Sequence, residues 1–178
     1  MCKPVILSWS GGKDSALALH ALSRDPTIEV VGLLTSVTRG YNRISVHGVR
    51  RAMLEAQVQR LSLPLFEIHL DPNCTNDAYE PAFHAALCEV KRERPNLSHI
   101  AFGDLFLEDV RAYRERLLAG SGFDPLFPIW GLDTAKLARR FIALGFIARL
   151  VCVDTTQLDA DFAGQAFDEQ LLADLPRT

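Results

Sequence analysis

The sequence lacks long apolar runs, paired cysteines and an excess of positive charge. No stretch reaches the roughly 18 apolar residues of a membrane-spanning helix, and the apolar run in "MCKPVILSWSGG" is too short for a signal peptide. These absences predict a cytoplasmic protein without a membrane partner. The formal net charge of -3 argues against general nucleic-acid binding, which usually needs a basic excess. None of the four cysteines forms a CxxC metal or redox motif.

What is present is an ordinary globular composition, with 48% hydrophobic and 23% charged residues over 178 positions. We expect one domain over residues 1–178, with residues 155–178 as a C-terminal extension that contains a short helix. Short apolar runs alternate with helical patterns, which predicts right-handed βαβ units. The fold class is therefore α/β, with three layers and a doubly wound parallel sheet of about five strands. The expected strands are Pro4–Trp9, Ile28–Val37, Pro64–Leu70, Ser98–Asp104 and Phe146–Asp154.

The expected helices follow these strands. "DSALALHALSR", "HGVRRAMLEAQVQRLS" and "LEDVRAYRERLLAG" have helical apolar spacing, as does the stretch from Asn76 to about Arg94. A further helix begins after Asp133, a good N-cap residue, and ends at Gly145. "DPLFPIWG" between these helices is expected to be short and extended.

The stretch "VILSWSGGKDSALALHAL" carries the clearest chemistry. A buried strand ends at two glycines, and a helix with charged residues in its first turn begins directly after them. The unpaired N–H groups of that turn and the helix dipole favour an anion, and glycines let it approach closely. Hydroxyls and an ammonium add donors, and the carboxylate of Asp14 suits Mg²⁺. The predicted ATP-binding residues are Ser10, Gly11, Gly12, Lys13, Asp14 and Ser15.

The loop is neither a Walker A motif nor a GxGxxG loop. The alternative interpretation is a plain strand–helix turn that needs glycine only for packing. The combination of Ser, Gly, Gly, Lys, Asp and Ser at a helix start favours the anion site.

Other candidates lie after later strands. Asp104 ends a predicted strand on the ligand side of the sheet, and a helix N-cap is its alternative role. Gly103 directly precedes Asp104, and Glu108 and Arg111 lie near the start of the next helix, where they are candidates to point into the same cleft. Arg111 has the geometry to bind phosphate or carboxylate, or else it lies on a solvated helix face. Trp130 either lines an acceptor pocket or packs in the core.

The loop between residues 35 and 49 is long for a connection between a strand and a helix, and long loops often have functions. It leaves the second strand beside the glycine loop, so its polar side chains are candidates to cover a ligand. A flexible solvated loop is the alternative. The candidates on and after it are Arg39, Tyr41, Arg43, His47, Arg50 and Arg51.

"SGGKDS" resembles the PP-loop signature SGGxDS of ATP pyrophosphatases, which grips the pyrophosphate part of ATP. Together with "ISVHGVRRAMLEAQVQRLSLPL", "AFGDLFLEDVRAYRERLL", "PLFPIWG" and "LDADFAGQAFDEQLLADLP", it resembles the diphthine–ammonia ligase family of adenine-nucleotide α-hydrolase-like proteins. The similarity is collinear over nearly the whole chain. Many members continue into a GExGEFHT segment, whereas this sequence stops at "LPRT", which leads us to expect an ATP site without the usual site for a second substrate.

The resemblance implies a C–N ligase that takes ATP and Mg²⁺ and releases AMP and pyrophosphate while it adenylates an acceptor carboxylate. Ammonia would then displace AMP, and a homo-oligomer is possible. Lys13, Asp14 and Asp104 are the expected catalytic residues, with Asp14 as the metal ligand. Two alternatives are a regulatory module that holds ATP or AMP without turnover and a PP-loop enzyme that modifies tRNA.

Overall fold

The computed structural model describes residues 2–45 and 48–176. The chain divides into two compact units, of which the first ends at Gly131 and the second begins at Leu132. We expected a C-terminal extension to begin at residue 155, whereas the second unit already begins at Leu132. The prediction of one domain over the whole chain stays a prediction.

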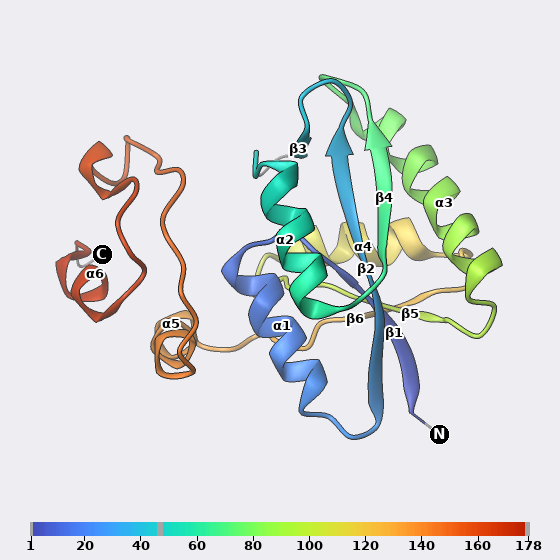
Figure 1. The fold of residues 1–178 in the computed structure, drawn as a ribbon, viewed down its shortest axis with the longest axis horizontal. Coiled ribbons are helices and arrows are strands. Elements are labelled where there is room, and N and C mark those ends of the chain that lie inside the picture. Colours follow the sequence, from blue (N-terminus) through green and yellow to red (C-terminus); the bar gives the residue numbers. More distant parts are fainter. Residues whose placement is uncertain (1, 46–47, 177–178) are drawn as a thin grey trace. The chain divides into compact units, whose positions relative to one another are not determined.

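The first unit is built on a mainly parallel sheet (Figure 1). From edge to edge, its five parallel strands run in the order β4, β2, β1, β5 and β6. A two-residue strand, β3, pairs antiparallel with the end of β2. The strands are β1 (Lys3–Ser8), β2 (Ile28–Thr38), β3 (Arg43–Ile44), β4 (Leu65–Leu70), β5 (His99–Ala101) and β6 (Asp124–Leu126). The expected α/β fold with a parallel sheet of about five strands is confirmed.

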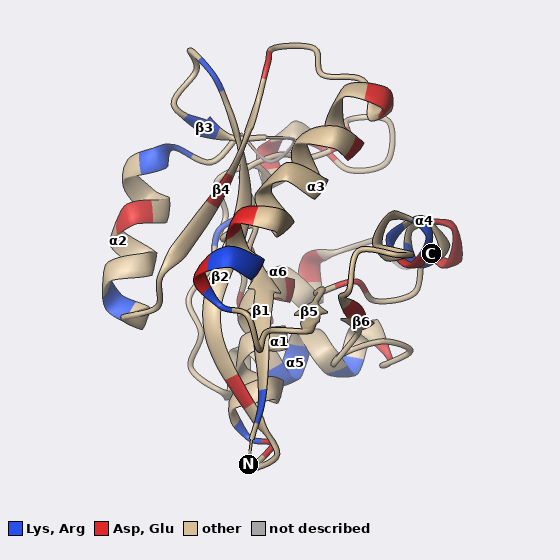
Figure 2. Cartoon of the chain, turned by 90° about the vertical axis from the view of Figure 1, so that its right-hand side faces the viewer, with Lys and Arg blue, Asp and Glu red and all other residues tan. Residues whose placement is uncertain are grey.

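Helices cover both faces of this sheet (Figures 1 and 2). Two helices, α1 (Lys13–Ser23) and α2 (Arg51–Leu61), lie on one face, and α3 (Asn76–Glu93) and α4 (Glu108–Leu118) lie on the other. The central strand is buried between them, because Val5, Ile6 and Leu7 expose none of their surface. A strand that is apolar on both faces is what a doubly covered parallel sheet requires.

The predicted helices are present, with one shift. We expected the second helix to begin at His47, which lies outside the described residues, whereas α2 begins at Arg51. Gly48 has a φ of +63°, and Arg50 is still extended, so the backbone reaches helical geometry only after them. Within the described chain, no helix combines the length and apolar character needed to cross a membrane.

The second unit contains α5 (Thr134–Ala143), a 3₁₀ turn (Ala160–Phe162) and α6 (Glu169–Asp174). Asp133 caps α5 as predicted, because its side chain accepts a hydrogen bond from the Lys136 N–H at 2.8 Å. The rings of Phe141 and Phe146 stack with centroids 5.0 Å apart, and Phe167 meets Phe141 edge-on.

The predicted strand Phe146–Asp154 is wrong. Its backbone forms only an isolated antiparallel bridge, between Arg149 and Ala166. Ile147 is 95% exposed and Val151 is 79% exposed, so this apolar run does not supply a buried strand. The fifth parallel strand is instead β6, in the "DPLFPIWG" segment that we expected only to be extended.

Candidate functional site

The glycine loop (Ser10–Ser15) and the Gly103–Asp104 pair follow two adjacent strands of the sheet. β1 pairs with β5, and the chain leaves these strands in opposite directions, toward β2 and toward β6. Such a switch point opens a crevice at the carboxyl ends of the strands, where open α/β sheets bind ligands. The topology therefore makes this edge the candidate site.

The glycine loop turns the chain sharply from β1 into α1. Gly11 has a φ of +75°, which favours glycine, and Gly12 is the N-cap of the helix. The first helical backbone bond runs from the Ala16 N–H to the Gly12 carbonyl at 3.1 Å. The earlier N–H groups of this turn therefore point out of the helix toward any anion at its N-terminus.

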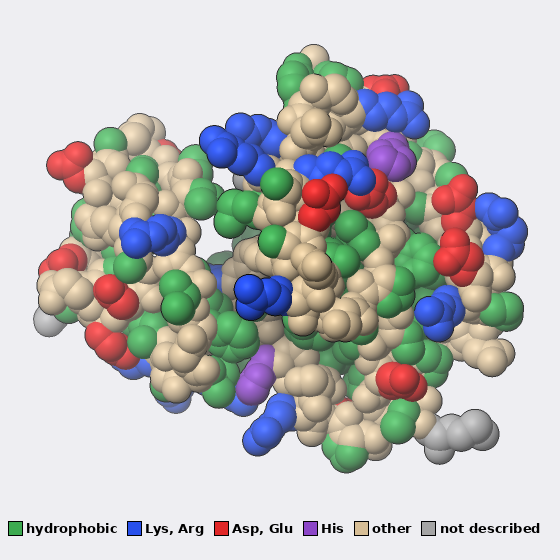
Figure 3. All heavy atoms as spheres, in the orientation of Figure 1, with side chains coloured by type: hydrophobic (Ala, Val, Ile, Leu, Met, Phe, Trp, Pro, Cys, Tyr) green, Lys and Arg blue, Asp and Glu red, His purple; other side chains and the backbone are tan. Residues whose placement is uncertain are grey.

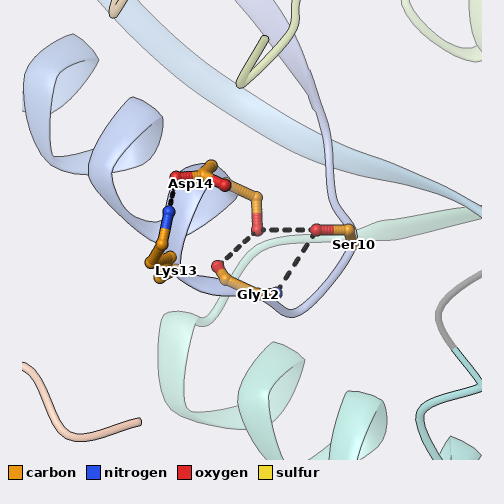
Figure 4. A network of polar contacts seen from close by, with 5 residues as sticks. Ser10, Gly12, Lys13 and Asp14 are labelled. Atoms are coloured by element: carbon orange, nitrogen blue, oxygen red, sulfur yellow. Dashed lines mark hydrogen bonds and ion pairs between the residues drawn. The ribbon is translucent and has the colours of Figure 1, made fainter. Parts of the chain in front are cut away.

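The two serines of the loop hold it together (Figure 4). The Ser15 hydroxyl donates to the Gly12 carbonyl at 2.9 Å and accepts from the Ser10 hydroxyl at 3.3 Å. The Gly12 N–H in turn donates to the Ser10 oxygen at 3.3 Å. Ser15 is only 3% exposed, so in this structure its hydroxyl stabilises the turn rather than facing solvent.

Lys13 and Asp14 bring both charges to the first turn. The Lys13 ammonium donates to Asp14 Oδ1 at 2.5 Å, and about a third of each side chain is exposed (34% and 37%). An ammonium beside the outward N–H groups favours phosphate, whereas a carboxylate there is acceptable when a cation accompanies it. The pair is thus suited to a phosphate group that carries a metal ion.

A residue that the sequence did not indicate supports this loop from a distant helix. Gln57 of α2 accepts a hydrogen bond from the Trp9 indole N–H at 3.0 Å and donates one to the Gly11 carbonyl at 3.1 Å. Trp9 itself is 5% exposed. The side-chain amide thus joins the end of β1 to the turn, and no motif or spacing in the sequence signals it.

Gly103 lies directly against the start of α1. A Cβ at this position would stand 3.0 Å from the Asp14 carbonyl carbon and oxygen and 3.1 Å from the Ser15 nitrogen. Glycine is needed here because any side chain would meet backbone atoms. The predicted site residues Gly103 and Asp14 are therefore neighbours in the fold.

Asp104 faces Arg114 of α4. Asp104 Oδ2 lies 3.6 Å from Arg114 Nε, too long for a hydrogen bond, and neither atom has a hydrogen-bond partner in the described chain. Both atoms are buried, as is the Tyr113 hydroxyl, which also lacks a partner there. Burial raises the pKa of nearby Tyr79 above its usual value, although Arg114 opposes that shift.

Arg111 and Trp130, two further predicted site residues, contact each other. The guanidinium carbon of Arg111 lies 4.9 Å from the ring centroids of both Trp130 and Phe127. For Glu108, at the start of the same helix, the structure shows no ion pair or side-chain hydrogen bond within the described residues.

The candidates from the loop after β2 line a separate pocket. It has a volume of about 440 Å³ and is lined by Tyr41, Asn42, Arg43, Arg50, Arg51, Ala52 and Glu55. Basic side chains gather over β3 and the start of α2, with acidic side chains beside them (Figure 3). Glu55 and Glu67 pair with Arg51 and raise the pKa of its guanidinium. Arg39 is paired with Asp71 at 3.2 Å, and the predicted candidate His47 lies outside the described residues.

Comparisons with known proteins place these observations in context. The family model of the diphthamide synthase N-terminal domain matches residues 3–125. A solved structure, the predicted subunit of a tRNA methyltransferase from Methanocaldococcus jannaschii, is similar over 85% of this chain and 80% of that chain, with a TM-score of 0.51 and 18% identity. At that identity the likeness concerns the fold alone.

A second solved structure is more distant. The FMN adenylyltransferase of Candida glabrata, in complex with FAD and inorganic pyrophosphate, matches 78% of this chain and 47% of its own, with a TM-score of 0.46 and 15% identity. A search of curated proteins found no match.

Proposed function

Because the chain belongs to the diphthamide synthase N-terminal domain family, we propose that it is an ATP-dependent enzyme that binds ATP at the glycine loop and adenylates an acceptor carboxylate. The observation that carries this proposal is the glycine turn at the carboxyl end of β1, which opens α1 beside the switch point of the sheet. Outward N–H groups, the helix dipole and Lys13 together favour the β and γ phosphates there. The proposed ATP-binding residues are Ser10, Gly11, Gly12, Lys13, Asp14 and Ser15.

The residues at this edge also fit a magnesium ion that arrives with ATP. Mg²⁺ prefers oxygen ligands and usually binds through one or two carboxylates together with phosphates. Asp14 offers a partly exposed carboxylate in the first turn of α1, and Asp104 has a carboxylate oxygen without a hydrogen-bond partner in the described chain. Residues 2–45 and 48–176 group no three His, Cys, Asp or Glu side chains that would hold a metal on their own. When bound, Mg²⁺ neutralises charge on the departing pyrophosphate.

In the proposed reaction an acceptor carboxylate oxygen bonds to the α-phosphorus of ATP while the bond from that phosphorus to the bridging oxygen breaks. Pyrophosphate leaves, and an acyl adenylate remains. Ammonia then attacks the acyl carbon, AMP departs, and loss of a proton gives the amide. The chain would contribute by positioning the reactants and by stabilising charge. Lys13 would neutralise the leaving phosphates, and Asp104 would orient the acceptor.

Chromatography of the nucleotide products tests this proposal. ATP, Mg²⁺, ammonium and a panel of carboxylic acids should yield AMP and pyrophosphate, at a rate that depends on the acceptor. ADP and orthophosphate as the main products would contradict the reaction. Tight ATP binding without turnover for any acceptor would instead favour a regulatory module that holds the nucleotide.

A further inference from the structure

Two arginines face each other beside the pocket over β3 and the start of α2. Arg43 and Arg50 form an isolated antiparallel bridge. The residues on either side of them make the backbone hydrogen bonds, from the Ile44 N–H to the Val49 carbonyl at 2.8 Å and from the Arg51 N–H to the Asn42 carbonyl at 2.9 Å. The two arginines are therefore a non-hydrogen-bonded pair, in which opposite side chains share one face and start from closely spaced Cα atoms.

These two arginines carry positive charges that the described chain does not compensate. Like charges directly opposite each other destabilise paired strands. Arg43 Nη1 donates to a backbone carbonyl at 2.6 Å, and the Arg50 side chain has no hydrogen bond or ion pair with any described residue. The neighbouring Arg51, by contrast, is paired with Glu55 and Glu67. Two adjacent guanidiniums without carboxylate partners in the described chain are suited to an anion from outside the chain.

The pocket beside this pair has room for a small ligand. Its volume of about 440 Å³ lies within the range of roughly 300–1,000 Å³ that small-molecule sites have. The carboxylate of Glu55 also lines the pocket, but it already accepts a hydrogen bond from Arg51 at 3.0 Å. Tyr41 lines the pocket too, is 64% exposed, and has no ring or cation contact among the described residues. The pocket thus combines two uncompensated positive charges with an aromatic ring that is open to a ligand.

The pocket and the glycine loop lie on opposite sides of β3. Ile44 is buried, and its Cδ1 atom would lie 3.7 Å from a Cβ on Gly11. Successive side chains of a strand point to opposite sides, so Arg43 points away from the glycine loop. On α2, Gln57 reaches Gly11, whereas Glu55 lines the pocket. The pocket is therefore a site of its own rather than an extension of the proposed ATP site.

The charges of the pocket favour a phosphate group over a carboxylate. A phosphate monoester carries a charge of about −1.5 to −2 at pH 7 and presents three acceptor oxygens. It can offset both guanidiniums and accept hydrogen bonds from each, whereas a carboxylate would leave one guanidinium uncompensated. A planar group attached to the phosphate would stack on the ring of Tyr41. Small aromatic phosphates have both features, and nucleoside monophosphates are among them.

We propose that this pocket binds a small organic phosphate, whose phosphate group is held by Arg43 and Arg50 and whose planar ring rests on Tyr41. The ligand is a monoester without a bound metal ion. In Mg-ATP, by contrast, the metal ion already offsets charge on the phosphates, so that ligand suits the glycine loop. The pocket is additional to the glycine loop, and the proposal stands whether or not the chain adenylates an acceptor.

Phenyl phosphate is a minimal probe with both features, and calorimetric titration in metal-free buffer measures its binding. It should bind saturably, more tightly than ribose 5-phosphate, which lacks the aromatic ring, and than benzoate, which lacks the second negative charge. Arg43→Gln and Arg50→Gln should each weaken its binding at least about tenfold, the loss expected for hydrogen bonds between charged groups. Tyr41→Leu should weaken the binding of phenyl phosphate about fivefold and leave that of ribose 5-phosphate unchanged.

Two further variants control for other sites. Arg39→Gln removes an arginine of the same loop that pairs with Asp71 and does not line the pocket, so it should bind phenyl phosphate as the wild type does. Gly12→Val alters the glycine loop and should also keep this affinity. Loss of binding in Gly12→Val would place the ligand at the glycine loop and overturn the separate site. An equal loss in Arg39→Gln would reduce the effect to general positive charge and overturn the site as well.

Melting temperatures without ligand separate a binding role of Arg50 from a structural one. Arg50→Gln removes one of two facing like charges, so it should melt no lower than the wild type. Arg51→Gln takes the guanidinium from Glu67, whose side chain is only 14% exposed, and should melt lower. If Arg50→Gln melted as low as Arg51→Gln, Arg50 would be a structural residue and the proposal would fail.

The titrations can also contradict the proposal directly. No saturable binding of phenyl phosphate, equally tight binding of benzoate, or an unchanged affinity in folded Arg43→Gln or Arg50→Gln would overturn the phosphate pocket. An unchanged affinity for phenyl phosphate in Tyr41→Leu would overturn the ring contact. None of these measurements uses ATP or turnover, so their outcome is independent of whether the proposed function holds.

Discussion

The side-chain amide of Gln57 donates a hydrogen bond to the carbonyl oxygen of Gly11 at 3.1 Å, across 46 positions of sequence. The same side chain accepts from the Trp9 indole at 3.0 Å, so α2 holds the end of β1 and the turn after it in one geometry. A Cβ on Gly11 would come 2.9 Å from the Gln57 oxygen, which shows how closely the two residues approach. The shape of the glycine loop thus depends on a residue outside it.

Gln57→Ala should lower both stability and ATP affinity. It leaves the buried indole N–H of Trp9 without its partner, which costs about 1–3 kcal/mol, and it frees the Gly11 carbonyl. We expect ATP affinity to fall about tenfold, the equivalent of one such bond. Urea unfolding and calorimetric titration measure the two effects. Gln59→Ala, on the exposed side of the same helix, is the control, and equal behaviour of the two variants would refute the supporting role.

Gly103→Ala should destabilise the protein. The added methyl group would lie 3.0 Å from the backbone of Asp14, and a rigid backbone cannot move aside as a side chain can. Overpacking of this kind typically costs about 1–3 kcal/mol. The measurement is the urea midpoint at constant slope. Wild-type stability in the variant would show that the contact between the end of β5 and α1 is looser than described.

Asp104→Asn should lower turnover more than it lowers ATP affinity, if Asp104 acts on the acceptor or metal. The amide keeps the size of the side chain but loses the charge that faces Arg114. Misplacement of a reacting group can cost about 10²-fold in rate, so we expect a loss of that order in kcat. Steady-state kinetics and a nucleotide titration on the same preparation decide the matter. A parallel loss of both quantities would make Asp104 a structural residue.

The stability of the fold should fall in mild acid because of His99. Burial, aided by Lys3 and opposed by Asp124, lowers the pKa of His99 below its usual value of 6.5. The unfolded chain therefore binds a proton at His99 more readily than the folded protein does. The contribution of neutral His99 to the free energy of unfolding is thus fully present above pH 6.5, and it is lost as the pH falls through the lowered pKa of His99 in the folded protein. His99→Gln should flatten the dependence of the urea midpoint on pH between neutrality and that lowered value. An unchanged slope in the variant would exclude His99 as the cause.

The sequence predicted the features that are encoded locally. The glycine loop, β1 and α1 are contiguous, so a single stretch shows a buried strand, a turn and a helix start. The central strands are apolar on both faces, which also predicts their parallel pairing. Because the carboxyl ends of such strands share one edge, the sequence alone places Asp14 and Gly103 at the same edge of the sheet. Their direct contact depends on the pairing of β1 with β5, which the sequence did not predict.

The remaining features depend on tertiary contacts or on segments too short to recognise. β6 has only three residues and includes Pro125, a residue tolerated at the edge of a sheet but depleted in strands. The longer apolar run that begins at Phe146 has the composition of a better strand, yet it lies in the second unit. Gln57 and the rings around Arg111 come from separate elements, and nothing in their spacing predicts that they meet.

The account rests most directly on the glycine loop as the ATP site, and calorimetric titration of Mg-ATP into the wild type and Gly12→Val tests it. A Cβ at Gly12 would meet only the Ser10 hydroxyl oxygen, at 3.4 Å, and the φ of −93° suits any residue, so the variant should fold and melt normally. Its side chain would stand at the helix start where phosphate is expected to approach. We predict that ATP binding is lost while the melting temperature is kept. Equal affinity of the folded variant and the wild type would contradict the assignment.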